Sequence, residues 1–298
     1  MMKSLGFLFF ITAIFFSSGS ATAQNTDLAR LEFTYFPQES SDNSFRRVRS
    51  FINFPIKLDN GNYLMPGLEY RNINLKYNDP APFDTDNLDR FQSLEARLVY
   101  IHNINDNWRF ATELGTQAAS NFSSDDLLDD DLLLVASGLF IHKKDFESSV
   151  KKRRIVFGLR YSTTTGFPFP LPIFILNKRV NQNISYNLGV PKTSLKYHFN
   201  KRSSLQSFLT LDGFYANLQE EIPVATAQGA QVAEDIRMTV ILTGLGYQYK
   251  FTDELIFYAY SGYTILNDIR LRNSERDDIF TINQNNSFYA RTGIKFKF

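Results

Sequence analysis

The residues best suited to acid–base chemistry near neutral pH are three histidines, His102, His142 and His198. Each lies just before a predicted turn, and the order of the turns predicts that all three lie at the same end of the molecule. A serine hydrolase needs such a base hydrogen-bonded to its nucleophile, but the sequence has no G-x-S-x-G motif. Zinc-ligand spacing and the phosphate-binding G-x-x-x-x-G-K-[ST] loop are also absent. The sequence therefore predicts no catalytic residue, no metal site and no cofactor.

A second set of polar residues consists of arginines, glutamates and a lysine that alternate with apolar residues. Successive side chains of a strand point to opposite faces, so these charges gather on one face of a sheet, which lines the lumen if the sheet closes into a barrel. The predicted lumen charges are Arg47, Arg49, Glu69, Arg71, Glu95, Arg97, Arg109, Glu113, Arg160, Arg291 and Lys295. They form either a paired ladder that fills the lumen, because unpaired buried charges are costly, or a basic strip along an aqueous pore that favours anions.

The order of the strands also predicts which of these charges are paired. Arg71, Arg97 and Arg109 lie beside glutamates on neighbouring strands, so they are expected to stabilise the barrel. Most of the others lack an acidic neighbour and are expected to set ion selectivity. These are Arg47, Arg49, Arg160, Arg291 and Lys295.

The segments that carry these charges have the pattern of β-strands. Leu94, Leu98 and Tyr100 alternate with Glu95 and Arg97, for example, and the same period of two recurs along the chain. Short turns rich in Asn, Asp and Gly alternate with long polar connections, which is typical of transmembrane barrels. A soluble β-sandwich shows the same alternation but buries its apolar face. The predicted fold is all-β, a transmembrane antiparallel β-barrel of about 14 strands.

The strand count and the connections leave some alternatives open. If the turns within residues 173–199 are not real, the count falls to about 12. Residues 143–152 form a long connection where a short turn is expected, and residues 189–192 form a short one where a long loop is expected. Residues 120–131 and 219–235 are expected to be long outer loops.

Both ends of the chain indicate export to a bacterial outer membrane. Residues 1–23 have a basic start, an apolar run and the small-residue cleavage site Ala21-Thr22-Ala23, which predicts a cleaved signal peptide. Residues 24–298 then form one barrel domain. The last segment alternates apolar and polar residues and ends on Phe296 and Phe298. It resembles the C-terminal strand of outer-membrane barrels, which implies that these two aromatics act as the assembly signal.

The overall composition agrees with such a barrel. The formal net charge is +1 and there is no cysteine, so neither a nucleic-acid partner nor a disulfide framework is expected. Aromatic residues make up 15% of the chain, and the mean hydropathy is −0.25. The low hydropathy does not argue against membrane insertion, because a barrel alternates lipid-facing and polar residues.

Several segments resemble a Bacteroidota outer-membrane β-barrel family known mainly as a domain of unknown function. They are Gln24 after the signal, FRRVRSFINFPIKL at 45–58, the segment from Pro191 to Asn200, and the last strand. The resemblance implies the fold and brings no activity. The predicted function is a porin-like pore for small solutes or a structural barrel, and not an enzyme. The alternatives are an enzyme acting on lipid or peptide, or an adhesion barrel. Expected partners are outer-membrane lipid, the barrel-assembly machinery and small solutes.

Overall fold

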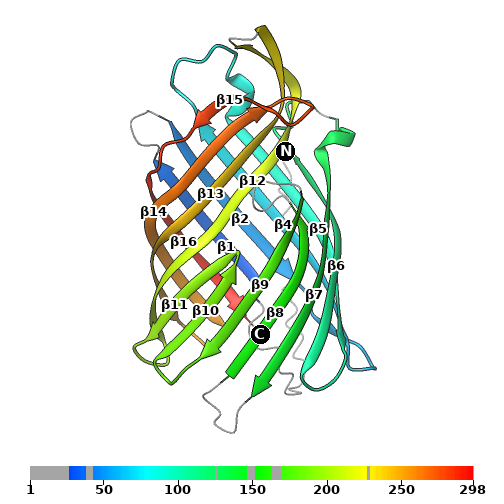
Figure 1. Ribbon diagram of the computed structural model, residues 1–298, viewed down its shortest axis with the longest axis vertical. Helices are drawn as coiled ribbons and strands as arrows, with labels where there is room; N and C mark the ends of the chain where they lie inside the picture. The colour runs from blue at the N-terminus through cyan, green and yellow to red at the C-terminus, as the bar shows by residue number, and fades with distance from the viewer. Residues whose placement is uncertain are drawn as a thin grey trace, which may run out of the picture.

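The computed structural model describes residues 27–37, 43–124, 126–145, 152–162, 169–226 and 229–297. They form one antiparallel β-sheet that curls until its first and last strands pair and close a barrel (Figure 1). In this part of the chain the helical segments are two short 3₁₀ turns, η1 (Asp86–Leu88) and η2 (Asp129–Asp131). No helix among the described residues is long and apolar enough to cross a membrane. The predicted signal peptide and Phe298 lie outside the described residues.

Fourteen strands form the closed wall, as the sequence predicts, and the alternative of twelve is wrong. They are β1 (Asp27–Pro37), β2 (Ser44–Asn53), β4 (Tyr63–Lys76), β5 (Arg90–Asn103), β6 (Trp108–Ser120), β7 (Leu132–Asp145), β8 (Lys152–Ser162), β9 (Phe169–Arg179), β10 (Ile184–Val190), β11 (Lys192–His198), β12 (Ser203–Thr226), β13 (Gly229–Lys250), β14 (Leu255–Arg272) and β16 (Phe288–Lys297). Two short pieces, β3 (Ile56–Lys57) and β15 (Asp278–Asn283), pair with β4 and β14. The uncertain region 173–199 holds the end of β9 and all of β10 and β11.

The alternation of residues produces this wall because each strand has one face towards lipid and one towards the lumen. On β5, Leu94 points outward and is 56% exposed, whereas Glu95 points inward and is 2% exposed. On β6, Leu114 is 63% exposed and Glu113 only 5%. A soluble β-sandwich would bury its apolar face. The exposed apolar face and the closed sheet together identify a membrane barrel.

The two ends of the barrel are built differently. β1 begins and β16 ends at one end, here called the turn end, and the opposite end is called the loop end. Residues 219–235, expected to be a loop, are largely β-strand, because β12 and β13 stay paired as far as Thr226 and Gly229. In the same way β7 and β8 run on to the pair Asp145 and Lys152. Both segments are rich in polar residues, so the sequence pattern does not indicate that the strands continue through them and extend beyond the rest of the wall.

The wall is much lower on one side. β10 and β11 have seven residues each and meet at Pro191, so they end far below the tips of β12 and β13 (Figure 1). Asn217 of β12 pairs in parallel with Ser120 of β6, although β7–β11 separate these strands in the sheet. The loop end is therefore closed by a contact that bypasses β7–β11.

Candidate functional site

The loop-end half of the lumen is filled by an apolar cluster that strand alternation does not predict. Phe36 packs against Phe45, and Phe214 packs against both Phe45 and Phe91, with ring centres 5.4 to 5.9 Å apart. All four rings are at most 2% exposed. The buried members of this cluster come from β1, β2, β4, β5, η1 and β12–β16, and among the described residues none comes from β6–β11. The cluster therefore packs one side of the barrel only.

A network of ion pairs lies below this cluster on the same side. Glu69 accepts hydrogen bonds from Arg49 Nε at 2.8 Å and from Arg71 Nε at 2.6 Å. Arg97 Nη1 lies 3.5 Å from Glu69 and donates to Glu95 at 2.6 Å. Buried charges are stable only when paired in this way. Arg71 and Arg97 each form an ion pair, as the sequence predicts. Arg49 was expected to lack an acidic neighbour, but it forms an ion pair as well.

Asp212, which is not among the predicted lumen charges, links three strands across the lumen. It accepts hydrogen bonds from Arg47 Nη2 at 2.7 Å and from Arg291 Nη2 at 2.6 Å. Arg291 Nε also lies 3.6 Å from Glu32. The expectation that Arg47 and Arg291 lack carboxylate partners is wrong, because their partner stands on the distant strand β12. The alternation along β12 could have placed Asp212 on the inward face.

The remaining predicted lumen charges are held less firmly. Arg160 Nη1 lies 3.3 Å from Glu113, and the Arg160 side chain is 31% exposed. Lys295 Nζ lies 4.0 Å from Asp27 Oδ1. Arg109, expected to be paired, makes no ion pair with any of the described residues. The network is therefore strong near β2 and β4 and weak towards β8.

The side of the lumen formed by β7–β11, here called the open side, is packed less tightly than the rest. Most of its inward-facing side chains are only partly buried, including Leu139, Ile175, Asn187 and Ser194. The buried exceptions are Val135, Val156, Ser162 and Ile173. On the rest of the wall, here called the packed side, most inward residues of β1, β2, β4 and β5 are fully buried. The lumen is therefore filled less completely along the open side than along the packed side.

Four lysines face the turn-end half of the lumen. Lys192 and Lys196 come from β11, and Lys295 and Lys297 come from β16. Lys196 Nζ donates a hydrogen bond of 2.7 Å to the side chain of Gln248. Only Lys295 was predicted as a site residue; Lys192 and Lys196 lie on β11, in the region whose turns were uncertain. These lysines make the turn-end half of the lumen basic.

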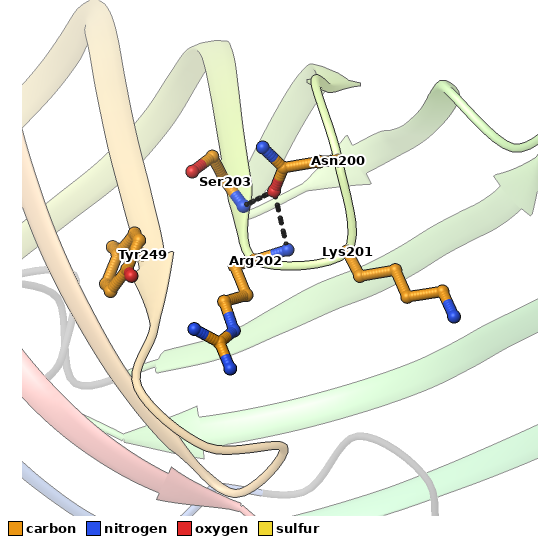
Figure 2. Close-up of a pocket in the computed structure, with 5 residues that line it drawn as sticks. All are labelled: Asn200, Lys201, Arg202, Ser203 and Tyr249. Carbon is orange, nitrogen blue, oxygen red and sulfur yellow. Dashed lines mark hydrogen bonds between the residues drawn. The ribbon is translucent and has the colours of Figure 1, made fainter.

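A shallow hollow lies at the turn between β11 and β12, as Figure 2 shows. It is lined by Asn200, Lys201, Arg202, Ser203 and Tyr249. Asn200 Oδ1 accepts hydrogen bonds from the backbone N–H groups of Arg202 and Ser203, both at 2.8 Å. This bonding is how an Asn side chain stabilises a tight turn. The side chains of Lys201 and Arg202 project from it and add positive charge to the turn end.

The three histidines do not form a hydrolase site. His198 Nε2 lies 2.9 Å from Ser185 Oγ, but among the described residues no carboxylate makes an ion pair with His198 to orient the ring. His102 stacks on Tyr100 with ring centres 6.5 Å apart, and the ring of His142 contacts that of Trp108 at a tilt, with centres 4.6 Å apart. Within the described residues no group of three or more His, Asp or Glu side chains could hold a metal.

Asp131, the last residue of the acidic run 125–131, holds the loop end together. Its carboxylate accepts hydrogen bonds from Asn217 at 2.9 Å, from Gln219 at 2.7 Å and from the backbone N–H of Leu128 at 2.8 Å. Burial disfavours the charged form, but these hydrogen bonds outweigh it and hold the pKa of Asp131 below its ordinary value. Asp131 thus anchors η2 to β12 beside the contact with β6.

The predicted assembly signal is only partly within the described residues. Phe296 lies on the outward face of β16 and is 45% exposed, in line with Ile294. Phe298 lies outside the described residues. The role of the two aromatics in assembly stays a prediction.

Comparison with known families gives one match, to a family described as a domain of unknown function (DUF6268), over residues 40–297. No curated protein matches the chain. The family description names no activity.

Several solved structures are similar to this chain in fold. The KdgM porin in complex with disordered oligogalacturonate has 9% identity and a TM-score of 0.36, with 90% of this chain and 99% of that chain covered. The NanC porin has 11% identity and a TM-score of 0.39, covering 91% and 100%. LpxR from Salmonella typhimurium has 8% identity and a TM-score of 0.40, covering 90% and 100%. At this distance the comparisons transfer no function.

Proposed function

Since the chain belongs to the family described as domain of unknown function DUF6268, we propose its function from its own geometry. The protein is an outer-membrane β-barrel that conducts small solutes along the open side of its lumen, and it performs no catalysis. Export by a cleaved signal peptide, insertion by the assembly machinery and origin in a Bacteroidota bacterium belong to the same proposal.

The asymmetry of the lumen carries this proposal. On the packed side the apolar cluster and the ion network leave little room, because most of their members are fully buried. On the open side, inward residues such as Leu139, Ile175 and Asn187 remain partly exposed. A route between the two ends for small solutes would therefore follow β7–β11, where the side chains fill the lumen least completely.

The charges also argue against a wide pore lined by free arginines. Arg47, Arg49 and Arg291 are bound to carboxylates at 2.6 to 2.9 Å, so they stabilise the packed side of the barrel. Arg160, with its 31% exposed side chain, is the arginine of this set that borders the open side. The ladder interpretation therefore applies to the packed side and the pore interpretation to the open side.

An enzymatic function has little support. The Ser185 and His198 pair is the arrangement nearest to a nucleophile and base. It lies among cations, with Lys196, Arg179 and Lys250 as its charged neighbours, and none of the described carboxylates makes an ion pair with His198 to orient the ring. A conducting barrel needs no such site.

Planar-bilayer recording tests the proposal with a matched pair of variants. Asn177 and Leu176 are neighbours on β9, but Asn177 points into the open side and pairs with Asn187, whereas Leu176 points to lipid. Asn177→Trp should reduce the single-channel conductance severalfold, and Leu176→Trp should leave it unchanged. Absence of conductance in the wild-type protein, or equal conductance in the two variants, would contradict a route along the open side.

A further inference from the structure

We propose that the turn-end half of the lumen is a binding site for the carboxylate or phosphate group of a small anionic solute. The site is formed by Lys192, Lys196, Lys295 and Lys297, which together are called the lysine chamber. This inference rests on the proposed function, because it names the class of solute that the open side would carry.

The lysines approach one another over a surface of aromatic rings. Lys192 Nζ lies 4.8 Å from the ring centre of Phe208 and 5.2 Å from that of Tyr260. Lys295 Nζ lies 5.6 Å from the ring centre of Tyr258. The rings of Tyr258 and Tyr260 are themselves 5.0 Å apart. The two tyrosines of β14 thus lie between the lysines of β11 and those of β16.

The chamber holds more positive charge than its carboxylates balance. Asp27 lies 4.0 Å from Lys295 Nζ and 3.8 Å from Lys297 Nζ, and it is also bonded to Arg30. Asp27 therefore serves three cations, of which, among the described residues, only Arg30 also lies near a second carboxylate, Glu32, at 3.8 Å. Like charges repel strongly in an interior of low dielectric, so the balance of charge favours an additional anion.

The lysines of β11 are the cations of the chamber without a carboxylate. Among the described residues neither Lys192 nor Lys196 makes an ion pair. Lys196 donates to the neutral amide of Gln248 and experiences repulsion from Lys297 and Lys192. A carboxylate or phosphate between these side chains would replace that repulsion with charge-assisted hydrogen bonds, which are among the strong ones in proteins.

Glycines on the neighbouring strands keep the chamber hollow. A Cβ atom at Gly246 would overlap the ring of Tyr260, and one at Gly293 would stand 2.6 Å from Tyr258 Oη. The rings can therefore lie along the wall instead of projecting into the lumen. Gln248 Nε2 donates to Tyr260 Oη at 2.6 Å and holds that ring in place.

The same features indicate what kind of molecule fits. The lysines bind an oxyanion, and the aromatic faces beside them suit a flat or apolar part of the same molecule. Ser194 stands between Lys192 and Lys196 on the inward face of β11 and is only partly buried, so a solute on the open side can reach the lysines. A small organic acid or phosphate ester has this combination of groups.

Calorimetry on the full-length protein in detergent tests the site with two probes, inorganic phosphate and acetate. Saturable binding of at least one probe is expected, and the tighter probe identifies the preferred oxyanion. The double variant Lys192→Gln with Lys196→Gln should weaken binding about tenfold or more, because it removes charged hydrogen-bond donors. Absence of saturable binding to the wild type would overturn the proposal.

Two further variants control for folding and for unspecific charge effects. Lys201→Gln removes an exposed lysine of the nearby turn (Figure 2) and should leave the affinity unchanged. Lys192→Arg with Lys196→Arg keeps both charges and should retain most of the binding. An equal loss with Lys201→Gln would overturn the site. Conductance recorded on the same proteins separates the two ideas: binding without conductance contradicts only the channel, and conductance without binding contradicts only the site.

Discussion

The two sides of the barrel share one sheet and one pattern of alternation, yet they are filled in different ways. On the packed side, long strands such as β12 and β13 carry apolar residues on their inward face, and Asp212 ties β12 to β2 and β16 across the lumen. On the open side, β10 and β11 have seven residues each, and their inward side chains are small or cationic. The difference shows that barrel closure and lumen filling are separate properties of a sequence.

The division also separates stability from transport. Ion pairs and rings on the packed side are buried, so removing one partner leaves a charge or a cavity that nothing else can fill. Residues on the open side remain in contact with water, which screens charge and fills space. Substitutions on the packed side should therefore change the stability of the barrel, and those on the open side should change what passes through it.

The largest effect is expected at the ion pair that crosses the lumen. Asp212→Asn leaves Arg47 and Arg291 buried without their carboxylate, which should lower the free energy of unfolding by about 3 to 5 kcal/mol. Arg160→Gln on the open side removes a partly exposed pair and should cost less than about 1 kcal/mol. Unfolding by urea in lipid vesicles compares the two, and similar losses would contradict the division into sides.

The apolar cluster gives the next comparison. Phe214 contacts Phe45 and Phe91 and is 2% exposed, so Phe214→Ala should destabilise the barrel by about 3 kcal/mol through the cavity it leaves. Leu139 points into the open side and is only partly buried, so Leu139→Ala should cost clearly less. The same urea experiment measures both, and a larger loss for Leu139→Ala would show that the open side is packed after all.

A smaller effect is expected at the loop end, where Asp131 joins η2 to β12. Hydrogen bonds hold its pKa below the ordinary 3.8, so its contribution to stability is present above pH 3.8 and is lost as pH falls through the lower value in the folded state. Asp131→Asn should cost about 1 to 3 kcal/mol at neutral pH and should weaken this acid dependence.

Limited proteolysis of the loop end between pH 7 and pH 3 measures the effect. Asp129→Asn, in the same turn but exposed, is the control and should leave the pH at which cleavage begins unchanged. If cleavage of Asp129→Asn and of Asp131→Asn begins at the same pH, the hydrogen bonds of Asp131 do not determine how well the loop end is held in place.

Much of the wall could be predicted from sequence, because a period of two fixes which side of a strand each residue occupies. That rule agrees with the outward position of Leu94 and Leu98 and with the inward, buried position of Glu69 and Glu95. The expected pairing of Arg71 and Arg97 is also present, but Arg71 meets Glu69 of its own strand, whereas Arg97 also reaches a glutamate, Glu69, on an adjacent strand.

The apolar cluster and the ion pairs of Asp212 depend on contacts across the lumen. The alternation of residues along a strand does not predict which residues meet there. Asp212 was missed because its partners lie on β2 and β16, far away along the wall. The apolar cluster was missed because Met238 and Val240 of β13 point inward, where the barrel pattern predicts polar residues. The expected ion pair of Arg109 is absent among the described residues, because the residues opposite it on β5 and β7 are Asn103 and Ile141 and carry no charge.

The smallest and most specific effect is expected on ion selectivity. It is tested by comparing one arginine of the open side with one arginine of the packed side. Arg160 borders the open side, whereas Arg291 is held by Asp212 at 2.6 Å on the packed side. Arg160→Glu should shift the reversal potential in a salt gradient towards cations, because it reverses a charge that faces water in the route. Arg291→Glu would place a second carboxylate beside Asp212, so it should lower the yield of folded barrel and leave the selectivity of the surviving channels close to that of the wild type. A shift with Arg291→Glu but none with Arg160→Glu would mean that solutes pass through the packed side.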